Sequence, residues 1–307
     1  MSLVSRRAAL QSLGALGLGA ALPASAVAAP RPARRDHHVV STHTFSVGEA
    51  LVTVIRDTGF PIPLSAIGTN VDDEAVVALM EEFGLPTETA PTDVSQLVID
   101  TGGVRVVLDT GTGQGNLIPA MQKLGLGEET VDRVVISHFH GDHVGGVSDG
   151  VVPTFPNASV HFPEPELAFL ESFEGENQGV TDALDALSPV RNVLETYDDG
   201  DELAPGLTAV AAHGHTPGHM VFVLESGDAR LMIASDAVAH PVAFFRYPEW
   251  LFGFDMAGDE TVATRRRLLD RAVDEKLPFF ASHMPFPGVG RVSRDGGGFR
   301  YTPAPML

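Results

Sequence analysis

One segment near the middle of the chain constrains its fold and its chemistry more than any other. Residues 134–146 read VVISHFHGDHVGG, so three histidines and an aspartate follow an apolar run and precede two glycines. In an extended strand, residues two positions apart project to the same side, which directs His138 and His140 toward one point. A glycine then lets the chain turn, so that Asp142 and His143 face the neighbouring space. The segment predicts ligands for two adjacent metal ions at the end of a strand.

The residue types of this segment also favour metal binding. A lone histidine is more often a surface or core imidazole, but four ligand-type side chains at this spacing favour a zinc-like ion, which prefers imidazole and carboxylate. The chain contains no cysteine, which excludes disulfides, a thiol nucleophile and thiolate metal sites. We expect Gly145 and Gly146 to permit close backbone approach at the start of a following helix.

The pattern H-x-H-x-D-H at residues 138–143 resembles the signature of the metallo-β-lactamase superfamily. Further motifs resemble those of the family in the same order along the chain: LDTG at Leu108–Gly111, GHTPGH at Gly214–His219, IASDA around Asp236 and ASHMPFPG around His283. Within the superfamily, the segments AHGHTPGH and SHMPFPGVG are most similar to the methyl parathion hydrolase branch. The resemblance covers residues 43–307, the length of one large domain.

This resemblance implies a fold, a cofactor and a set of ligands. The implied fold is mixed α/β (α+β), a four-layer αββα sandwich with the metal ions at one edge of its two sheets. The implied cofactor is a pair of divalent ions, with zinc preferred and manganese, cobalt or iron as alternatives. Such a pair lowers the pKa of a bridging water, so hydroxide would be the nucleophile and Asp142 and Asp236 the catalytic carboxylates. The implied ligands are His138, His140 and His215 for the first ion, Asp142, His143 and His283 for the second, and Asp236 for both.

Two further residues are expected to support these ligands. A ligating imidazole usually donates its second N–H to a carboxylate or carbonyl, and Asp109 in the LDTG motif suits that role. The alternative for Asp109 is a plain turn residue. His219 lies four residues after His215 and is expected to support the ligand residues without binding a metal ion itself. His213 and His240 lie near the motifs in sequence and are interpreted as structural.

The glycine-rich stretch DTGTGQGN resembles a phosphate-binding loop at first sight. Gly111, Gly113 and Gly115 follow a predicted strand and precede a predicted helix. Their spacing is G-x-G-x-G rather than G-x-G-x-x-G, and no Walker lysine follows. The stretch is better explained as a turn that brings Asp109 toward the metal ions.

Hydrophobic periodicity predicts strands and helices in an order typical of a layered sandwich. Helices are expected at 72–84, 116–127, 164–172 and 259–275. Strands are expected within 43–60, as a hairpin over 94–102 and 104–111, and at 131–137, 158–162, 207–215, 219–226, 229–236 and 278–286.

The segment His240–Phe254 is dense in aromatic residues. It can form part of the core, or it can line an apolar pocket for an acyl or leaving group. The pocket hypothesis places Phe244, Phe245 and Trp250 around the substrate, together with Phe286 just after the last predicted ligand.

The N-terminal residues resemble a twin-arginine export signal. Arg6 and Arg7 precede the apolar run Ala8–Ala21, and an A-x-A cleavage pattern follows at Ala24–Ala26. The run is shorter than the roughly 20 residues of a membrane span, which favours cleavage over a stable membrane anchor. We therefore expect a periplasmic or secreted protein with a signal peptide at 1–28, a linker or arm at 29–42 and a hydrolase domain at 43–307.

The charge of the chain narrows the choice of substrate. A formal net charge of −20 disfavours nucleic acid and anionic membranes as partners, and with them the nucleases of the superfamily. Its glutathione thioesterases need a basic surface that this sequence lacks, and some of its β-lactamases need a cysteine ligand. The remaining substrates are small, neutral, apolar esters and lactones.

The predicted function is therefore that of an exported dinuclear-metal hydrolase acting on organophosphate triesters or aryl esters. A lactonase, including one for acyl-homoserine lactones, is the alternative. Some lactonases of the superfamily place a tyrosine shortly after the bridging aspartate, whereas Ala237, Val238 and Ala239 stand here, which weighs against that alternative. A non-catalytic exported metal-binding protein is the second alternative. The resemblance and the apolar N-terminal strands allow a homodimer.

Overall fold

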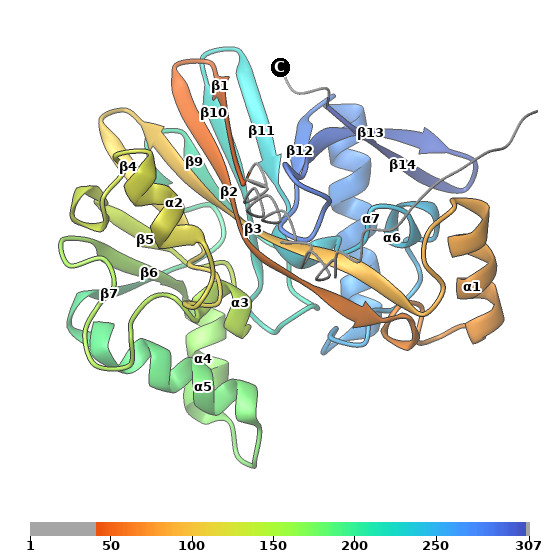
Figure 1. Cartoon of the computed structure of the whole chain (residues 1–307), viewed down its shortest axis with the longest axis horizontal. Helices are drawn as coiled ribbons and strands as arrows, with labels where there is room; N and C mark the ends of the chain where they lie inside the picture. The colour runs from red at the N-terminus through yellow and green to blue at the C-terminus, as the bar shows by residue number, and fades with distance from the viewer. Residues whose placement is uncertain (1–40, 305–307) are drawn as a thin grey trace, which may run out of the picture. The chain divides into compact units, whose positions relative to one another are not determined.

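The computed structural model describes residues 41–304. The predicted signal peptide at 1–28 and almost all of the predicted arm at 29–42 lie outside the described residues. Within them, fourteen strands form two seven-stranded sheets, with helices on either side (Figure 1). In this part of the chain, no helix combines the length and the apolar character that crossing a membrane requires.

The first sheet is antiparallel in its N-terminal half and parallel from β4 onward. Parallel strands end at the same edge of a sheet, so the segments after β4 and β5 meet there. In spatial order its strands are β1 (Thr42–Val47), β2 (Ala50–Pro63), β3 (Thr89–Thr101), β4 (Val104–Leu108), β5 (Arg133–Val135), β6 (Ser159–Pro163) and β7 (Leu194–Tyr197).

The second sheet is antiparallel except for the central pair β11 and β12. This parallel pair again sends two chain segments to one edge. In spatial order its strands are β14 (Gly298–Pro303), β13 (Val289–Asp295), β12 (Pro278–Phe280), β11 (Ala229–Ile233), β10 (Met220–Ser226), β9 (Leu207–Ala211) and β8 (Glu202–Ala204).

The helices form the two outer layers (Figure 1). One group packs on the first sheet: α2 (Leu117–Lys123), α3 (Gly141–Val144), α4 (Glu164–Ser172) and α5 (Gln178–Leu187). The other packs with the second sheet: α1 (Asp73–Glu82), α6 (Ala243–Arg246) and α7 (Gly258–Asp274). Short 3₁₀ turns are η1 (Leu64–Ala66), η2 (Glu128–Thr130), η3 (Ser188–Val193) and η4 (Ser235–Ala237).

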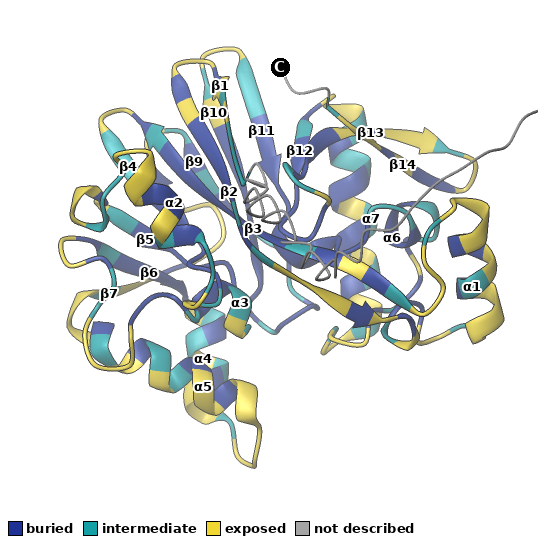
Figure 2. Cartoon of the chain, in the orientation of Figure 1, coloured by how far each residue is buried: buried dark blue, intermediate teal, exposed yellow. Residues whose placement is uncertain are grey.

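Alternation along the strands generates three apolar cores. On β3, Leu97 and Ile99 face the second sheet, whereas Val98 faces the outer helices. On β10, Phe222 likewise lies between the sheets, whereas Val221 lies with the helices of the other layer. Both faces of the central strands are therefore buried, whereas in Figure 2 the outer helix faces and parts of β2, β13 and β14 are exposed. The described fold is the predicted αββα sandwich.

Most predicted elements are present at shifted boundaries. The helix expected at 259–275 is α7, and the hairpin expected at 94–111 is β3 and β4. Two expectations were wrong in detail. The helix after the histidines includes Asp142 and His143 and ends at Val144, directly before Gly145, rather than starting there. The last predicted strand ends at Phe280, so His283 lies in the loop beyond it. The strands β7, β8, β13 and β14 were not predicted.

Candidate functional site

The histidine segment leaves the first sheet at the end of β5. Because β4 and β5 are parallel, the residues that follow them lie side by side. Asp109 follows β4, and Ser137 and His138 follow β5. The short helix α3 comes next and carries Asp142 and His143, whose ligand atoms lie close together.

The other predicted ligands come from the second sheet. His215 lies in the loop between β9 and β10, Asp236 lies in η4 directly after β11, and His283 lies in the loop after β12. The parallel pairing of β11 and β12 sends the last two to one edge. The structure thus brings together all seven residues that the sequence predicted as ligands: His138, His140, His215 and Asp236 in one cluster, and Asp142, His143 and His283 in another.

Four ligand atoms of the first cluster surround one point. His140 Nδ1 lies 3.1 Å from His138 Nε2 and 3.0 Å from His215 Nε2. Asp236 Oδ2 lies 3.8 Å from His138 Nε2 and 3.5 Å from His215 Nε2. Donor atoms placed tetrahedrally about 2 Å from one zinc-like ion have separations of this size. The cluster therefore fits the first ion of the predicted pair.

The second cluster adjoins the first through Asp236. Asp142 Oδ2 lies 3.8 Å from His143 Nε2 and 3.5 Å from His283 Nε2. Asp236 places Oδ1 3.2 Å from His143 Nε2 and Oδ2 2.9 Å from His283 Nε2. One carboxylate thus contacts ligand atoms of both clusters, which is the arrangement expected of a bridging ligand.

Unpaired polar atoms at this place support the fit to cations. Among the described residues, His143 Nε2 and Asp236 Oδ1 are fully buried and have no hydrogen-bond partner. Buried polar atoms are normally paired, so an orphaned pair facing the same space indicates a missing ligand. Burial raises the pKa of Asp236, but His283 and His143 outweigh it and hold the pKa well below its usual value. The resulting buried negative charge favours a cation.

The imidazoles differ in protonation according to their neighbours. Burial lowers the pKa of His138 and of His140 well below the usual value, so both are neutral, as metal ligands must be. Burial also lowers the pKa of His143 and His283, but Asp236 outweighs it. The pKa of His143 is raised well above its usual value, and that of His283 is raised to about 9. A carboxylate that attracts protons onto these rings attracts a divalent ion for the same electrostatic reason.

Asp109 holds one of the ligand rings. Its Oδ2 lies 2.8 Å from His143 Nδ1, and its carboxylate also accepts hydrogen bonds from the backbone N–H of Ser137, at 2.7 Å, and from the Ser137 hydroxyl, at 2.8 Å. Asp109 adopts a left-handed conformation with φ of 60°, which is costly for a residue with a Cβ. The side chain is buried, so this strained turn directs a carboxylate onto His143.

Three orienting groups were not found from the sequence. Ser137 Oγ lies 3.0 Å from His138 Nδ1, the carboxylate of Asp255 lies 3.0 Å from His215 Nδ1, and the carbonyl of Asp93 lies 2.9 Å from His283 Nδ1. Each contact leaves the other ring nitrogen facing the cluster. Ser137 was detectable as the neighbour of the first histidine. The other two have no local sequence signal, because tertiary contacts bring them to the site.

His219 and Glu166 support the site from outside the clusters. His219 Nδ1 donates to the carbonyl of Ala212 at 3.0 Å, and its Nε2 accepts from the Asp236 backbone N–H at 3.3 Å. Burial lowers the pKa of His219 to about 3, so the ring is neutral. Glu166, which the sequence analysis missed, accepts from the backbone N–H groups of Phe139 and Gly218. It joins the two loops that carry the histidines of the first cluster.

The glycine-rich turn packs directly against the histidine segment. A Cβ on Gly146 would collide with the Thr110 carbonyl, and a Cβ on Gly113 would come within 2.6 Å of the Gly145 carbonyl oxygen. The backbone N–H of Thr110 donates to the carbonyl of His143 at 2.7 Å. The glycines therefore allow close packing beside Asp109, in agreement with the turn interpretation.

A pocket of about 260 Å³ opens above the two clusters. Ligand residues from both clusters form its floor. Its apolar wall consists of Phe60 and Ile62 from β2 and Phe252 and Phe254 from the loop before α7. Phe60 and Phe254 are exposed, with 39% and 50% of their surface accessible. Among residues 41–304, no Lys or Arg lines this pocket.

The structure corrects the predicted pocket residues. Phe244 and Phe245 are buried because α6 turns their rings into the outer core, and Trp250 stacks on Tyr247. Phe286 packs against the core between the sheets. None of these four predicted residues lines the pocket above the clusters. The predicted aromatic segment does reach this pocket, but through its last residues, Phe252 and Phe254, and the β2 wall was not foreseen.

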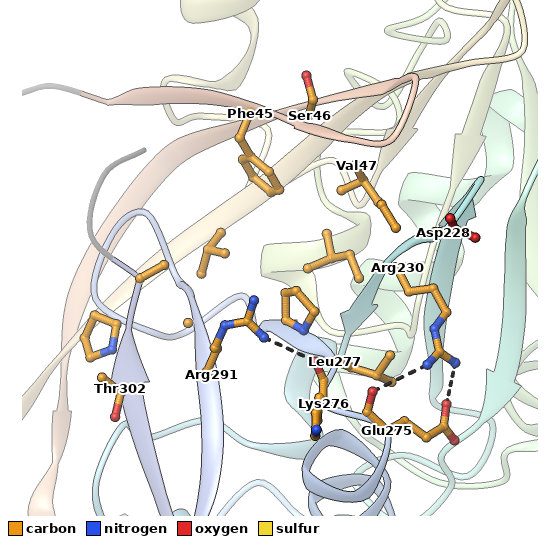
Figure 3. A pocket seen from close by; sticks show the side chains of 17 residues that line it. Phe45, Ser46, Val47, Asp228, Arg230, Glu275, Lys276, Leu277, Arg291 and Thr302 are labelled. Carbon is orange, nitrogen blue, oxygen red and sulfur yellow. Dashed lines mark hydrogen bonds and ion pairs between the residues drawn. The ribbon is translucent and has the colours of Figure 1, made fainter.

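A larger hollow of about 710 Å³ lies elsewhere, between β1, β11, β13 and β14 (Figure 3). Phe45 points into it, Arg230 pairs with Glu275 at 2.6 Å, and Arg291 donates to the Lys276 carbonyl at 3.2 Å. None of the predicted site residues lines it. It is therefore separate from the metal clusters.

The sandwich and the paired His/Asp clusters at its edge define a metal-dependent hydrolase with a dinuclear, zinc-type site. The chain belongs to the metallo-beta-lactamase superfamily, whose family model matches residues 89–283.

Solved structures of similar fold cover nearly the whole described chain. One is AidC, a dizinc quorum-quenching lactonase solved in complex with a product, N-hexanoyl-L-homoserine. It is 25% identical, with a TM-score of 0.83, and the similarity covers 87% of this chain and 98% of AidC. Another is the hydrolase AbOPH of the beta lactamase superfamily, 23% identical with a TM-score of 0.81 over 88% of this chain and 99% of that one. The second likeness concerns the fold alone.

Curated relatives match over a shorter region. An atrochrysone carboxyl ACP thioesterase of Passalora fulva is 29% identical over 148 residues, which is 46% of this chain and 37% of that protein. A hydroxyacylglutathione hydrolase of Vibrio campbellii is 29% identical over 120 residues, 38% of this chain and 37% of that protein. The chain thus spans less than two fifths of the length of these relatives.

Proposed function

We propose that this hydrolase cleaves lactones and neutral esters that carry an apolar acyl or aryl group. The observation that carries the proposal is the pocket above the clusters. Its floor is made of predicted metal ligands, and its wall is made of Phe60, Ile62, Phe252 and Phe254. An apolar wall beside a polar floor suits a substrate with one hydrolysable polar group and one apolar arm. The described part of the lining contributes no Lys or Arg, which favours neutral substrates over anionic ones such as glutathione thioesters.

Two divalent ions held by these clusters would activate a water molecule as the nucleophile and polarise the carbonyl oxygen of the substrate. The chain itself supplies the positions. Ser137, Asp255, Asp109 and the Asp93 carbonyl fix the ring of one ligand histidine each. The aromatic wall would bind the acyl or aryl arm and exclude water from its side of the site.

The lactone reading gains support from the likeness to AidC, which extends over 98% of that lactonase. Ala237, Val238 and Ala239 follow Asp236 and are all buried, so a substrate-orienting phenol is absent at this place in the described structure. A lactone would therefore be oriented by the pocket wall and the ions rather than by a phenol at this place. We propose zinc as the resident metal because five imidazoles and two carboxylates form the donor set.

Neutral organophosphate triesters are the second candidate substrates, in line with the likeness of two sequence segments to the methyl parathion hydrolase branch. The same pocket observation favours them, since a triester is uncharged and carries an apolar leaving group.

A substrate panel tests the proposal. The protein is depleted of metal, reconstituted with zinc, manganese or cobalt, and assayed on N-hexanoyl- and N-decanoyl-homoserine lactone, dihydrocoumarin, 4-nitrophenyl butyrate, paraoxon, S-lactoylglutathione and nitrocefin. We expect the highest kcat/KM on a lactone or a neutral ester, with paraoxon as the outcome that favours the second candidate. A highest kcat/KM on S-lactoylglutathione or nitrocefin would overturn the proposal.

We also propose that the chain is exported through its twin-arginine segment, which lies outside the described residues. Replacing Arg6 and Arg7 together by Lys in the full chain should retain the protein in the cytoplasm of a host with twin-arginine transport. Unchanged export of this variant would contradict the proposal.

A further inference from the structure

We propose that Asp255 and Arg265 form a buried positioning pair that fixes, as one unit, the ligand His215 and the pocket loop, the segment before α7 that carries Phe252 and Phe254 of the pocket wall. Neither residue lines the pocket or belongs to a ligand cluster. The part of the proposal that concerns substrate binding rests on the proposed function, whereas the part that concerns metal binding does not.

Arg265 is an unusual component of a protein core. It lies on α7, is 1% exposed, and is among the largest fully buried side chains of the described chain. Its guanidinium sits over the ring of Phe244, 4.4 Å from the ring centre. Burying a guanidinium is costly unless its donors are paired, so a position that keeps one is under a specific geometric constraint.

The donors of Arg265 hold three parts of the site region together. Nε donates to the carbonyl of Ala237, next to the bridging carboxylate, at 2.9 Å. Nη1 donates to the carbonyls of Pro248, at 3.1 Å, and Trp250, at 2.7 Å. Nη2 donates to Asp255 Oδ2 at 3.3 Å. The planar, forked guanidinium can reach all these acceptors at once, which a lysine ammonium cannot.

Asp255 connects this guanidinium to a metal ligand. Its side chain is 1% exposed, and its Oδ1 lies 3.0 Å from His215 Nδ1. Its Oδ2 accepts from the Phe252 backbone N–H at 3.0 Å as well as from Arg265. One carboxylate therefore holds the ring of a ligand with one oxygen and the pocket loop with the other.

The pocket loop is also joined directly to the loop between β9 and β10, which carries His215. Met256 N–H donates to the His215 carbonyl at 3.1 Å, and Ala257 N–H donates to the Gly214 carbonyl at 2.8 Å. The Phe252 ring stacks on the His215 ring, with centres 6.5 Å apart and planes 16° apart. A shift of Asp255 should therefore move His215 and the pocket loop with Phe252 and Phe254 together.

The inference predicts two coupled effects of disrupting the pair. Losing the carboxylate that orients a metal-bound imidazole typically weakens metal affinity by about 10–100-fold. The same change should raise KM for a long-chain substrate more than for a short-chain one, since the wall is displaced, and should leave the second ion bound. A pair with a merely structural role would lower stability without either effect.

The test compares Asp255→Asn, Arg265→Met and the double variant, all as full-length protein. Zinc affinity is measured by competition with a chromophoric chelator, which needs no substrate, and thermal unfolding is followed in parallel. The double variant removes the buried positive charge that Asp255→Asn leaves without a counter-charge, so it should be more stable than Asp255→Asn. We expect it nevertheless to bind one of the two zinc ions about 10–100-fold more weakly than the unmodified chain. Where the panel yields two substrates that differ in chain length, the KM for the long-chain substrate divided by the KM for the short-chain one should rise.

Asp270→Asn is the matched control, because Asp270 lies on the same helix but pairs with the exposed Arg294. It should leave zinc affinity and KM unchanged. Wild-type zinc affinity in Asp255→Asn, or recovery of zinc affinity together with stability in the double variant, would overturn the proposal. If Asp255→Asn fails to fold, Arg265→Lys carries the test: it keeps the charge but loses the fork, so it should bind one zinc ion more weakly. Unchanged zinc affinity in Arg265→Lys would then overturn the proposal.

Discussion

His283 Nδ1 lies 2.9 Å from the carbonyl oxygen of Asp93, a residue 190 positions earlier in the chain. The contact joins β3 of the first sheet to the loop after β12 of the second. The Asp93 side chain adds to it, because it accepts hydrogen bonds from Phe286 N–H at 2.8 Å and from Arg56 Nε at 2.6 Å. The last ligand of the site is thus held by the opposite sheet.

Asp93→Ala should loosen the loop that carries His283. The backbone carbonyl remains, but Phe286 and Arg56 lose their acceptor. We expect a loss of about 1–3 kcal/mol in the free energy of unfolding, measured in urea, and weaker binding of one zinc ion. Glu171→Ala, which breaks the exposed pair with Arg191, is the control and should change neither quantity. An effect of Glu171→Ala equal to that of Asp93→Ala would contradict the assignment.

Asp236→Ala should reduce hydrolysis to the background rate, because Asp236 contacts ligand atoms of both clusters. His140→Ala should do the same through the first cluster alone. Metal content by plasma emission and kcat/KM measure the two effects. We expect fewer than two ions per chain in each variant. Full activity of a metal-depleted Asp236→Ala protein is the result that would rule out the proposed chemistry.

His240 should make the fold sensitive to acid. Burial lowers the pKa of His240 to about 4, and its Nδ1 accepts from the N–H groups of Val242 and Ala243. Its pKa in the unfolded chain is about 6.5, so between these values only the unfolded chain binds the proton. Stability therefore rises with pH across this window and is lost as the pH falls, by up to about 3 kcal/mol.

His240→Asn isolates this contribution, because the Asn carbonyl can replace Nδ1 as the acceptor and does not titrate. Urea unfolding at pH 5 and pH 7.5 gives the difference in unfolding free energy for each protein. The difference should be smaller in the variant. Equal differences in the two proteins would show that His240 does not carry the effect.

Substitutions of Phe254 and Phe244 should distinguish a residue of the pocket wall from a residue of the core. Phe254 is half exposed on the pocket wall, so Phe254→Ala should raise KM for substrates with an apolar arm and leave the unfolding free energy nearly unchanged. Phe244 is fully buried away from the pocket, so Phe244→Ala should cost about 3–5 kcal/mol of stability. Steady-state kinetics and urea unfolding on both variants check this. The reverse pattern would restore the pocket role first predicted for Phe244.

The ligand residues could be read from the sequence because their chemistry is local. His138, His140, Asp142 and His143 lie within six residues directly after β5, which ends at Val135, so one short segment carries four of the predicted ligands. The sandwich was likewise readable, since alternation along the strands and helical periodicity between them record which faces are buried. The resemblance to the motifs of the superfamily then implied the remaining three ligands.

Tertiary structure alone decided what surrounds these ligands. Asp93 and Asp255 carry no local pattern, because each reaches its histidine through a contact between distant segments. The pocket wall was misassigned for the same reason. An aromatic side chain in sequence is equally suited to core and to pocket, and only the direction of the helix α6 turns Phe244 inward while the following loop leaves Phe254 over the metal ligands. The sequence shows how many apolar side chains there are, but only the packing of the folded chain determines which of them a substrate can contact.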